Sequence, residues 1–165
     1  MQIKKVPIII NFQYEINNII KLIIPNENLM YSWITLVFKQ HYKDDVIRYK
    51  DVIIHNELTI RFVEYKEIYT LNSYYRGINN LTNILSFPYE APSGITIPLL
   101  GEIVITPNLI LYESLKKNKS FIAHLAHIII HGCLHLIGYN HNNENDADKM
   151  ENIEYSILEQ INLYL

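Results

Sequence analysis

The sequence predicts a single α+β domain in which a small mixed β-sheet is packed with helices. The chain has 165 residues and 49% of them are hydrophobic, which is enough for one core spanning residues 1–165. Short alternating or β-branched runs are interspersed with longer segments whose apolar residues recur at helical spacing. Since no linker, internal repeat or low-complexity tail separates these segments, we expect one domain.

Four segments have the pattern of β-strands. Pro7 to Phe12 is apolar and β-branched, and Leu58 to Phe62 alternates apolar and polar residues. Asn83 to Phe87 is a strand that Pro88 stops, and Gly101 to Ile105 is a further strand. The strands near Leu58, Ile84 and Ile103 are expected to carry the sheet.

Helical spacing of apolar residues, together with helix-ending signals, predicts five helices. The segments are Asn28 to about His41, Tyr65 to Tyr75, Pro107 to about Lys117, Ser120 to Gly138 and Ala147 to Ile161. Pro107 suits a first helical turn, Ser120 can cap the fourth helix and Gly138 can end it. We expect connections at Lys43 to Asp51 and at Ala91 to Pro98.

Charge and cysteine content exclude several classes of function. The chain has 14 Lys and Arg against 17 Asp and Glu, so no global positive field holds nucleic acid and any contact needs a local patch. Cys133 is the single cysteine, cannot form an internal disulfide and is expected in the core. The apolar run Val6 to Ile10 is shorter than a signal-peptide core, and no stretch approaches the roughly 20 apolar residues of a membrane helix. We therefore expect a cytoplasmic protein without a membrane partner.

Three histidines have the spacing of a catalytic metal site. His131 and His135 are four residues apart, so a helix places them on one face about 6 Å apart along its axis. A left-handed turn at Gly138 lets the chain fold back and present His141 from another direction. Three imidazoles leave a fourth position open for water, as catalytic zinc requires. We predict one Zn²⁺ held by His131, His135 and His141.

Two further histidines lie on the same predicted helix. His127 is about 12 Å of helix rise from His135, too far for both to join His131 on one ion. We expect His124 and His127 to be buried polar residues or supports for the ligands, with His127 the better candidate to touch substrate. An ordinary packing role is the alternative for any single histidine.

Gly132 distinguishes this site from a protease site. The spacing of the histidines and Gly138 matches metzincin-type metalloproteases, but those enzymes have their catalytic glutamate where Gly132 stands. Glycine cannot accept a proton, so a protease would lack its general base. We expect Gly132 to leave open space beside the metal for a bulkier group such as a phosphodiester.

The segment His131-Gly-Cys-Leu-His-Leu-Ile-Gly-Tyr-Asn-His141 resembles the signature HGxLHLxGYDH of the YbeY family of rRNA-maturation endoribonucleases. Upstream, Tyr75-Arg76-Gly77 and then Thr82-Asn-Ile-Leu-Ser-Phe-Pro88 resemble that family's RG...TNVLSFP segment. Leu100-Gly-Glu-Ile-Val-Ile105 resembles its LGDIVI strand. The resemblance covers the chain from about Leu58 to the C-terminus.

The helix with Met150, Glu151 and Glu154 is also similar to the family, but two positions depart from its pattern. Glu102 and Asn140 stand where the family usually has Asp. Glu102 keeps the charge. Asn140 removes a carboxylate next to a predicted ligand, which weakens the case for a hydrogen bond to a histidine or a proton-accepting role there. Zinc binding should survive, since an amide oxygen still accepts.

The resemblance implies a zincin-like zinc helix and a zinc-dependent endoribonuclease specific for single-stranded RNA. It also implies action in small-subunit rRNA 3′-end maturation and late ribosome quality control, with the small ribosomal subunit and assembly factors as partners. Zinc can lower the pKa of its water to about 7 and polarise a phosphoryl oxygen.

Arg76 is the expected catalytic group beside the three histidines, because its planar guanidinium can bind two phosphate oxygens and stabilise developing charge. The alternative is a surface arginine in an ion pair. Arg76, His127 and Ser86 are the expected contacts to substrate. Ser86 is not expected to act as a nucleophile, since no histidine and acid are arranged to activate it.

Two other functions stay open from the residues alone. One is a metal-dependent hydrolase of another substrate, peptide included, because spacing cannot identify the substrate of a three-histidine site. The other is a non-catalytic ribosome-assembly factor in which zinc is structural. Gly132 disfavours the protease, and an open coordination position would disfavour the structural zinc.

Overall fold

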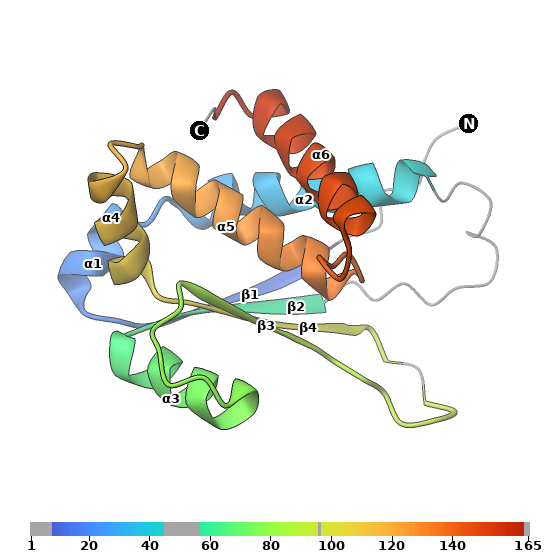
Figure 1. The fold of residues 1–165 in the computed structure, drawn as a ribbon, viewed down its shortest axis with the longest axis horizontal. Coiled ribbons are helices and arrows are strands. Elements are labelled where there is room, and N and C mark those ends of the chain that lie inside the picture. The colour runs from blue at the N-terminus through green and yellow to red at the C-terminus, as the bar shows by residue number, and fades with distance from the viewer. Residues whose placement is uncertain (1–7, 45–56, 96, 164–165) are drawn as a thin grey trace.

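The computed structural model describes residues 8–44, 57–95 and 97–163, which form a mixed four-stranded sheet with helices on both faces (Figure 1). The strands are β1 (Ile9–Glu15), β2 (Glu57–Val63), β3 (Ile84–Pro88) and β4 (Leu99–Ile105). The sheet order is β1-β2-β4-β3, with β1, β2 and β4 parallel and β3 antiparallel to β4. The α+β class with a mixed sheet is thus confirmed, and β3 forms one edge.

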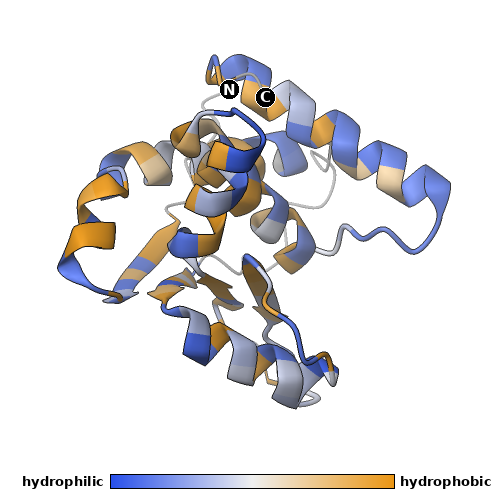
Figure 2. Ribbon diagram, turned by 60° about the vertical axis from the view of Figure 1, so that its left-hand side comes forward, coloured by the Kyte–Doolittle hydropathy of each residue, from blue (hydrophilic) through white to orange (hydrophobic). Residues whose placement is uncertain are grey.

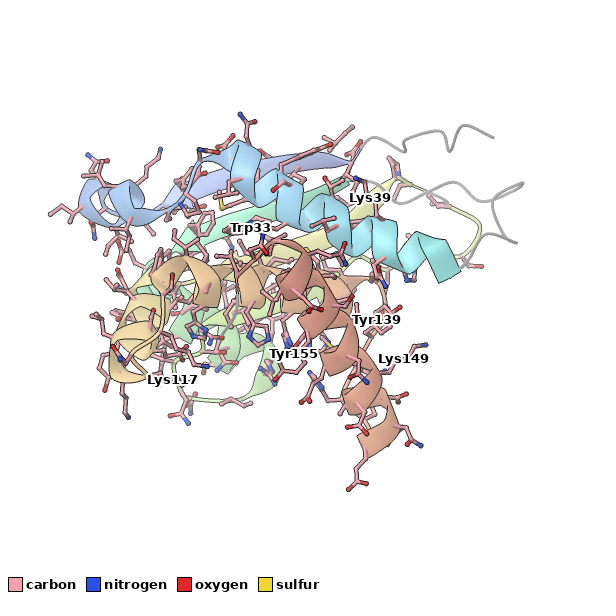
Figure 3. The ribbon with its side chains drawn as sticks, turned by 90° about the horizontal axis from the view of Figure 1, so that it is seen from above. Trp33, Lys39, Lys117, Tyr139, Lys149 and Tyr155 are labelled. Carbon is pink, nitrogen blue, oxygen red and sulfur yellow. The ribbon has the colours of Figure 1, made fainter. Side chains whose placement is uncertain are left out.

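Helices cover the sheet unequally. They are α1 (Asn18–Ile23), α2 (Glu27–Asp44), α3 (Tyr65–Arg76), α4 (Pro107–Lys116), α5 (Phe121–Leu136) and α6 (Glu144–Gln160). Helix α5 packs on β3 and β4 and also contacts α2, α4 and α6, whereas α3 lies across the opposite face (Figure 1). Seen from above, α2 and α6 lie beside each other, with Trp33 on α2 (Figure 3).

The main core lies between α5 and the sheet. Helix α5 is apolar apart from its four histidines and buries ten of its sixteen residues, as expected for a central helix. Ile129 and Cys133 of α5, Trp33 of α2 and Ile60 and Ile103 of the sheet are at most 1% exposed. The strands are mainly hydrophobic, while α6 is largely hydrophilic (Figure 2). Burial of this apolar surface, at roughly 25 cal/mol per Å², is the main force holding α5 in place.

A smaller cluster fixes α3 to the other face of the sheet. Val63, Leu85 and Val104 of the strands are buried against Ile68 of α3. Side chains alternate along a strand, so Ile103 and Ile105 face α5 while Val104 faces α3. Strand β4 is therefore apolar on both faces, which explains its nearly unbroken hydrophobic run.

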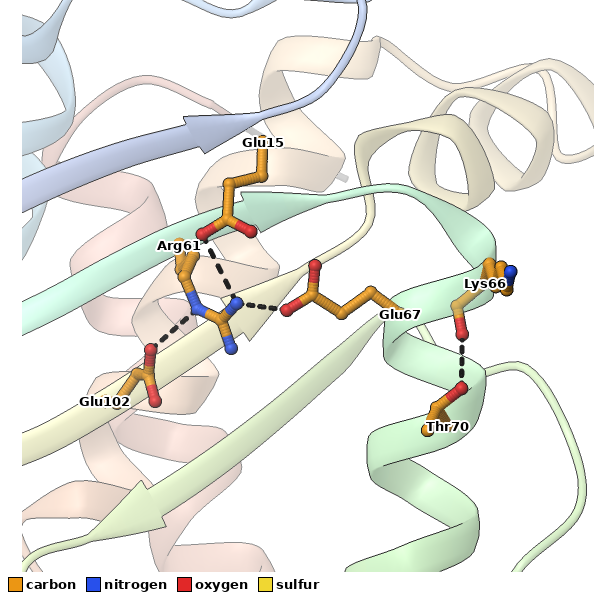
Figure 4. Close-up of polar contacts among 6 residues, drawn as sticks. All are labelled: Glu15, Arg61, Lys66, Glu67, Thr70 and Glu102. Atoms are coloured by element: carbon orange, nitrogen blue, oxygen red, sulfur yellow. Dashed lines mark hydrogen bonds and ion pairs between the residues drawn. The ribbon is translucent and has the colours of Figure 1, made fainter.

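Arg61 joins three elements on the α3 face (Figure 4). Its Nε donates to Glu102 on β4 at 2.8 Å, and its Nη1 pairs with Glu15 on β1 at 3.4 Å and with Glu67 on α3. Glu102 is one of the two departures from the family pattern. The longer side chain at position 102 thus serves an ion pair beneath the sheet, away from the predicted metal ligands.

The predicted elements are confirmed with shifted ends. Strand β1 begins at Ile9 and continues to Glu15, three residues past the predicted end at Phe12, because pairing with β2 persists and the Tyr14 ring stacks on Phe62 at 5.3 Å. Strand β3 includes Pro88, which an edge strand tolerates because no neighbour needs its missing N–H.

Helix α1 was not predicted. It has six residues, none of them buried, so no apolar periodicity marks it. Asn17 caps it by accepting a hydrogen bond from the Ile20 N–H at 2.9 Å. The predicted connection from Lys43 to Asp51 lies largely outside the described residues, and its first two residues end α2. No helix in the described ranges is long and apolar enough to cross a membrane.

Gly101 lets β3 and β4 approach closely. It is buried with φ of +152°, and a Cβ there would lie 2.3 Å from the backbone oxygen of Phe87 and 2.9 Å from Leu136 Cδ2. The carbonyl cannot retreat without disturbing the pairing of Pro88 with Gly101. Glycine is therefore required here.

We expect Gly101→Ala to lower the free energy of unfolding by about 3 kcal/mol, because the added methyl group overlaps backbone. Urea denaturation of both proteins measures the change. Gly94→Ala is the matched control, because Gly94 also has positive φ but a Cβ added there would meet no atom within 4 Å. It should lose only about 1 kcal/mol, and equal losses would contradict the steric explanation.

Cys133 should be chemically inert in the folded protein. It is fully buried on α5, and burial raises the pKa of its thiol to about 12, so almost no thiolate exists near neutral pH. We expect iodoacetamide to leave the native protein unmodified and to alkylate Cys133 once guanidinium chloride unfolds it. Mass spectrometry distinguishes the two states, and rapid native alkylation would contradict the buried placement.

Candidate metal centre

Helix α5 and the turn after it bring the three predicted ligands together. His131 and His135 lie one turn apart on α5 with ring centroids 4.5 Å apart. The His141 ring stacks on His131 at 5.1 Å and meets His135 at 5.2 Å. One nitrogen of each ring lies within 4.8 Å of the others, so the group can hold a metal ion.

A left-handed turn after α5 returns the chain to the site. Gly138 has φ of +100°, and the Tyr139 N–H donates to the Leu134 carbonyl at 3.0 Å, which closes the helix end. Asn140 Oδ1 then accepts from the Asn142 N–H at 3.1 Å. This is a local Asx turn, for which an amide oxygen serves as well as a carboxylate. Asn140, in place of the Asp that is usual in the family, therefore preserves the turn that presents His141.

The turn is also held against α6. Asn143 caps α6 by accepting from the Asp146 N–H at 2.9 Å, two residues after His141. Lys149 Nζ on α6 lies 5.6 Å from the centre of the Tyr139 ring, and Figure 3 shows both side chains at this corner. His141 is thus carried by a short segment anchored at both ends.

The Nδ1 atoms of two histidines are already engaged by protein groups. His135 Nδ1 donates to the Tyr139 carbonyl at 2.9 Å, and His131 Nδ1 donates to Glu154 Oε1 at 2.6 Å. Each Nδ1 therefore carries a proton, and in the neutral form of the ring this leaves Nε2 with the lone pair. Such second hydrogen bonds are typical of metal-binding histidines.

Glu154 is a buried carboxylate that serves two histidines. Its side chain is 6% exposed, and its second oxygen accepts from His127 Nε2 at 2.9 Å. Burial raises the pKa of Glu154, but hydrogen bonds from His127 and His131 outweigh this effect and hold the pKa at about 2. The carboxylate is ionised at neutral pH and acts only as an acceptor.

The donor set fits zinc. The Nε2 atoms of His131 and His135 lie 3.0 Å apart, so two lone pairs face each other unless a cation or proton lies between them. Two nitrogen ligands of a tetrahedral zinc ion are about 3.4 Å apart, close to this separation. Burial, reinforced by neighbouring His131 and His141, lowers the pKa of His135 and favours the neutral form that binds metal.

His127 and His124 lie outside the ligand group. The His127 ring centroid is 6.5 Å from that of His131, and its Nε2 is held by Glu154. His124 is buried, which agrees with its expected role as a buried polar residue. It donates from Nε2 to Glu113 Oε2 at 2.6 Å. Asn83 Nδ2 donates to the same oxygen at 3.0 Å. This group fastens the start of β3 to α4 and α5.

The expected role of Gly132 was wrong. Its missing side chain faces the sheet rather than open space beside the histidines, because a Cβ there would lie 2.6 Å from Ile84 Cδ1 and 3.2 Å from Ile103 Cδ1. On a helix, the residue after His131 points about 100° away from it. Glycine here lets α5 approach the sheet and makes no room for substrate.

Among the described residues, neither Arg76 nor Ser86 makes a side-chain hydrogen bond to the histidine group. Arg76 is exposed at the end of α3, on the other side of the sheet from α5 (Figure 1), and within the described residues its side chain makes no hydrogen bond or ion pair. Ser86 is half-buried in β3 opposite Ile103. It shares a strand face with Ile84, which packs on α5, so the hydroxyl lies on the histidine side of the edge strand.

Sequence reasoning noted Glu154 only as part of a similar helix and missed its contacts. The signal was available, because Met150, Ile157 and Leu158 of α6 form an apolar stripe and Glu154 lies within it. A charged residue in a buried stripe requires a partner. The identity of that partner depends on how α6 packs on α5.

The fold and this site define a small α+β protein with a three-histidine group able to hold a metal ion. A family model described as Endoribonuclease YbeY matches residues 15–162. The chain is 41% identical over 140 residues to Endoribonuclease YbeY of Pseudoalteromonas translucida (strain TAC 125), which covers 85% of each chain. The chain therefore belongs to the YbeY family of endoribonucleases.

A solved structure has the same fold. The solution structure of a Thermotoga maritima protein aligns with a TM-score of 0.54 and covers 93% of this chain and 92% of the other. The two sequences are 21% identical. At that identity, the likeness concerns the arrangement of sheet and helices.

We expect Glu154→Gln to weaken zinc binding about 10- to 100-fold, because an amide cannot accept from both His131 and His127. Competition with a chromogenic chelator measures the affinity, and urea unfolding of the metal-free protein separates lost affinity from lost stability. Glu151→Gln, at an exposed position of the same helix, is the control. Equal zinc affinity in the two variants would show that Glu154 does not position the ligands.

Proposed function

We propose that this protein is a zinc-dependent endoribonuclease specific for single-stranded RNA, with residues 1–165 as one domain and α5 as a zincin-like zinc helix. One observation supports the chemistry: the Nε2 atoms of His131 and His135 face each other at 3.0 Å beside His141, and each Nδ1 of the pair is engaged elsewhere. Membership in the YbeY family supports RNA as the substrate.

We further propose a cytoplasmic role in small-subunit rRNA 3′-end maturation and late ribosome quality control, with the small ribosomal subunit and assembly factors as partners. The family signature from His131 to His141 and the matching upstream segments support this role. The net charge of -3 gives little non-specific affinity for RNA. Recognition therefore depends on local groups or on a partner.

His131, His135 and His141 hold the metal in this proposal. A zinc ion in this position supplies a Lewis acid for a phosphoryl oxygen and a water of lowered pKa. Glu154 and the Tyr139 carbonyl keep the rings oriented with their lone pairs inward. His141 is exposed, so the group borders solvent and is accessible to a polymeric substrate.

Arg76, His127 and Ser86 are the proposed contacts to substrate, with Arg76 at the end of α3 on one face of the sheet and His127 on α5 at the other. The Arg76 guanidinium is exposed and has no carboxylate partner among the described residues, so it is free to bind two phosphate oxygens. His127 donates from Nε2 to Glu154, which leaves its Nδ1 as an acceptor for a hydroxyl such as that of ribose. These groups recognise phosphate and sugar rather than base sequence.

Cleavage of single-stranded RNA by purified protein of known metal content tests the proposal. We expect the intact protein to cut and His135→Ala to lose both bound zinc and cleavage. Arg76→Ala should lower kcat/KM about tenfold, since it removes a contact to a backbone phosphate on the α3 side of the sheet, away from the histidines. The kcat/KM of Arg76→Lys should lie between those of the intact protein and Arg76→Ala, because lysine keeps the charge but loses the planar pair of donors.

Lys117→Ala, at an exposed position after α4, is the control for loss of a positive charge and should cut normally. Circular dichroism confirms that each variant is folded. If intact protein, His135→Ala and Arg76→Ala all cut alike, the activity is a contaminant and the proposal fails. A zinc-loaded protein that binds RNA without cutting it would favour an assembly factor instead.

A further inference from the structure

Three aromatic rings form a continuous array beside Arg76. The Tyr74 and Tyr75 rings meet edge to face with centroids 4.8 Å apart, and Tyr75 meets Phe87 of β3 at 5.1 Å. Tyr74 is 80% exposed and Tyr75 is 62% exposed. The array extends from the last turn of α3 to the edge strand of the sheet.

The surroundings fix the base of this array. Phe87 pairs with Glu102 of β4 and packs against the smaller hydrophobic cluster, so the base of the array is fixed. After α3, the chain is tied back to it: buried Asn72 donates to the Asn80 carbonyl at 2.8 Å, and the Gly77 N–H donates to the Ser73 carbonyl at 3.0 Å. The backbone that carries the two exposed rings is therefore held in place, as is Phe87 beneath Tyr75.

Single exposed aromatic side chains are common on protein surfaces. Here two exposed rings lie on a fixed base, next to the Arg76 guanidinium, which pairs with no carboxylate among the described residues. Flat aromatic faces stack on unpaired bases of any sequence, and arginine binds the phosphate backbone. A double-stranded helix hides its bases from such contacts. The combination therefore matches single-stranded RNA.

We propose that Tyr74 and Tyr75 form a base-stacking subsite for single-stranded RNA, with Arg76 holding an adjoining backbone phosphate. This inference rests on the proposed function for its ligand. Strand β3 separates the rings from the histidines, since α3 and α5 lie on opposite faces of the sheet (Figure 1). The stacked bases thus belong to nucleotides beside the cleaved linkage, not to the linkage itself.

Loss of this subsite should weaken RNA binding without slowing the bond-breaking step. We expect Tyr74→Ala and Tyr75→Ala each to raise the Kd for a fluorescent single-stranded oligoribonucleotide about tenfold, and to raise KM with kcat unchanged. A dinucleotide, too short to reach the rings, should be cut equally by all variants. Tyr75→Phe keeps the stacking face and should bind normally.

Tyr112→Ala is the matched control, because Tyr112 is a similarly exposed tyrosine, 58% on α4, that makes no ring contact with this array. Tyr75→Trp adds a direct readout: its fluorescence should be quenched by single-stranded RNA, while Trp33 is 1% exposed and supplies a constant background. Tyr74→Ala also guards against misfolding, because Tyr74 meets only Tyr75 among the aromatic rings of the described residues.

Binding is measured separately from cleavage, so the two proposals can fail independently. If Tyr74→Ala and Tyr75→Ala bind RNA as tightly as Tyr112→Ala, the subsite is overturned, even where the intact protein cuts RNA normally. The same conclusion follows if these variants lose only a protein partner. If the intact protein fails to cut RNA but binds it through the tyrosines, the subsite stands and the nuclease proposal fails.

Discussion

The buried carboxylate of Glu154 is the interaction on which the site depends. It links α6 to α5 by accepting hydrogen bonds from His131 at 2.6 Å and His127 at 2.9 Å. Apolar contacts between two helices are not directional, so they leave some freedom to slide or rotate. A buried charge has no such freedom, because an unpaired carboxylate in the interior costs several kcal/mol. Glu154 therefore sets both the relative position of the helices and the orientation of His131, a proposed metal ligand.

Helix α5 combines the core and the site in one element. Gly132 and Cys133 face the sheet or the buried interior, while His131 and His135 point to the opposite side, next to the returning turn. Because the same helix is buried on the remaining faces, these two histidines are carried by an element that cannot shift without disturbing the core. Gly132 sets how closely that element approaches β3 and β4. Gly132 therefore affects the site through the packing distance between α5 and the sheet, and it does not provide space for substrate.

The sheet has different roles on its two faces. One face carries α5 and the histidines, and the other carries α3, Arg61 with its acidic partners and the exposed tyrosines. Edge strand β3 lies between them, fastened at its start by Asn83 to Glu113 and His124. A single-stranded polymer is long and flexible enough to contact both sides of such an edge. The geometry suits a substrate whose cleaved bond and recognised bases are separate.

The sequence alone determined the features that arise within about one or two helical turns. The four-residue spacing of His131 and His135, the turn at Gly138 and the strand alternation are local, so periodicity and backbone preference predict them. Tertiary structure decided the rest. Glu154 reaches His131 across 23 positions and Arg61 reaches Glu102 across 41, and no local pattern specifies such partners. The direction of Gly132 and the place of Arg76 likewise follow from how α5 and α3 pack on opposite faces of the sheet, because packing between distant segments depends on the shape of the whole core.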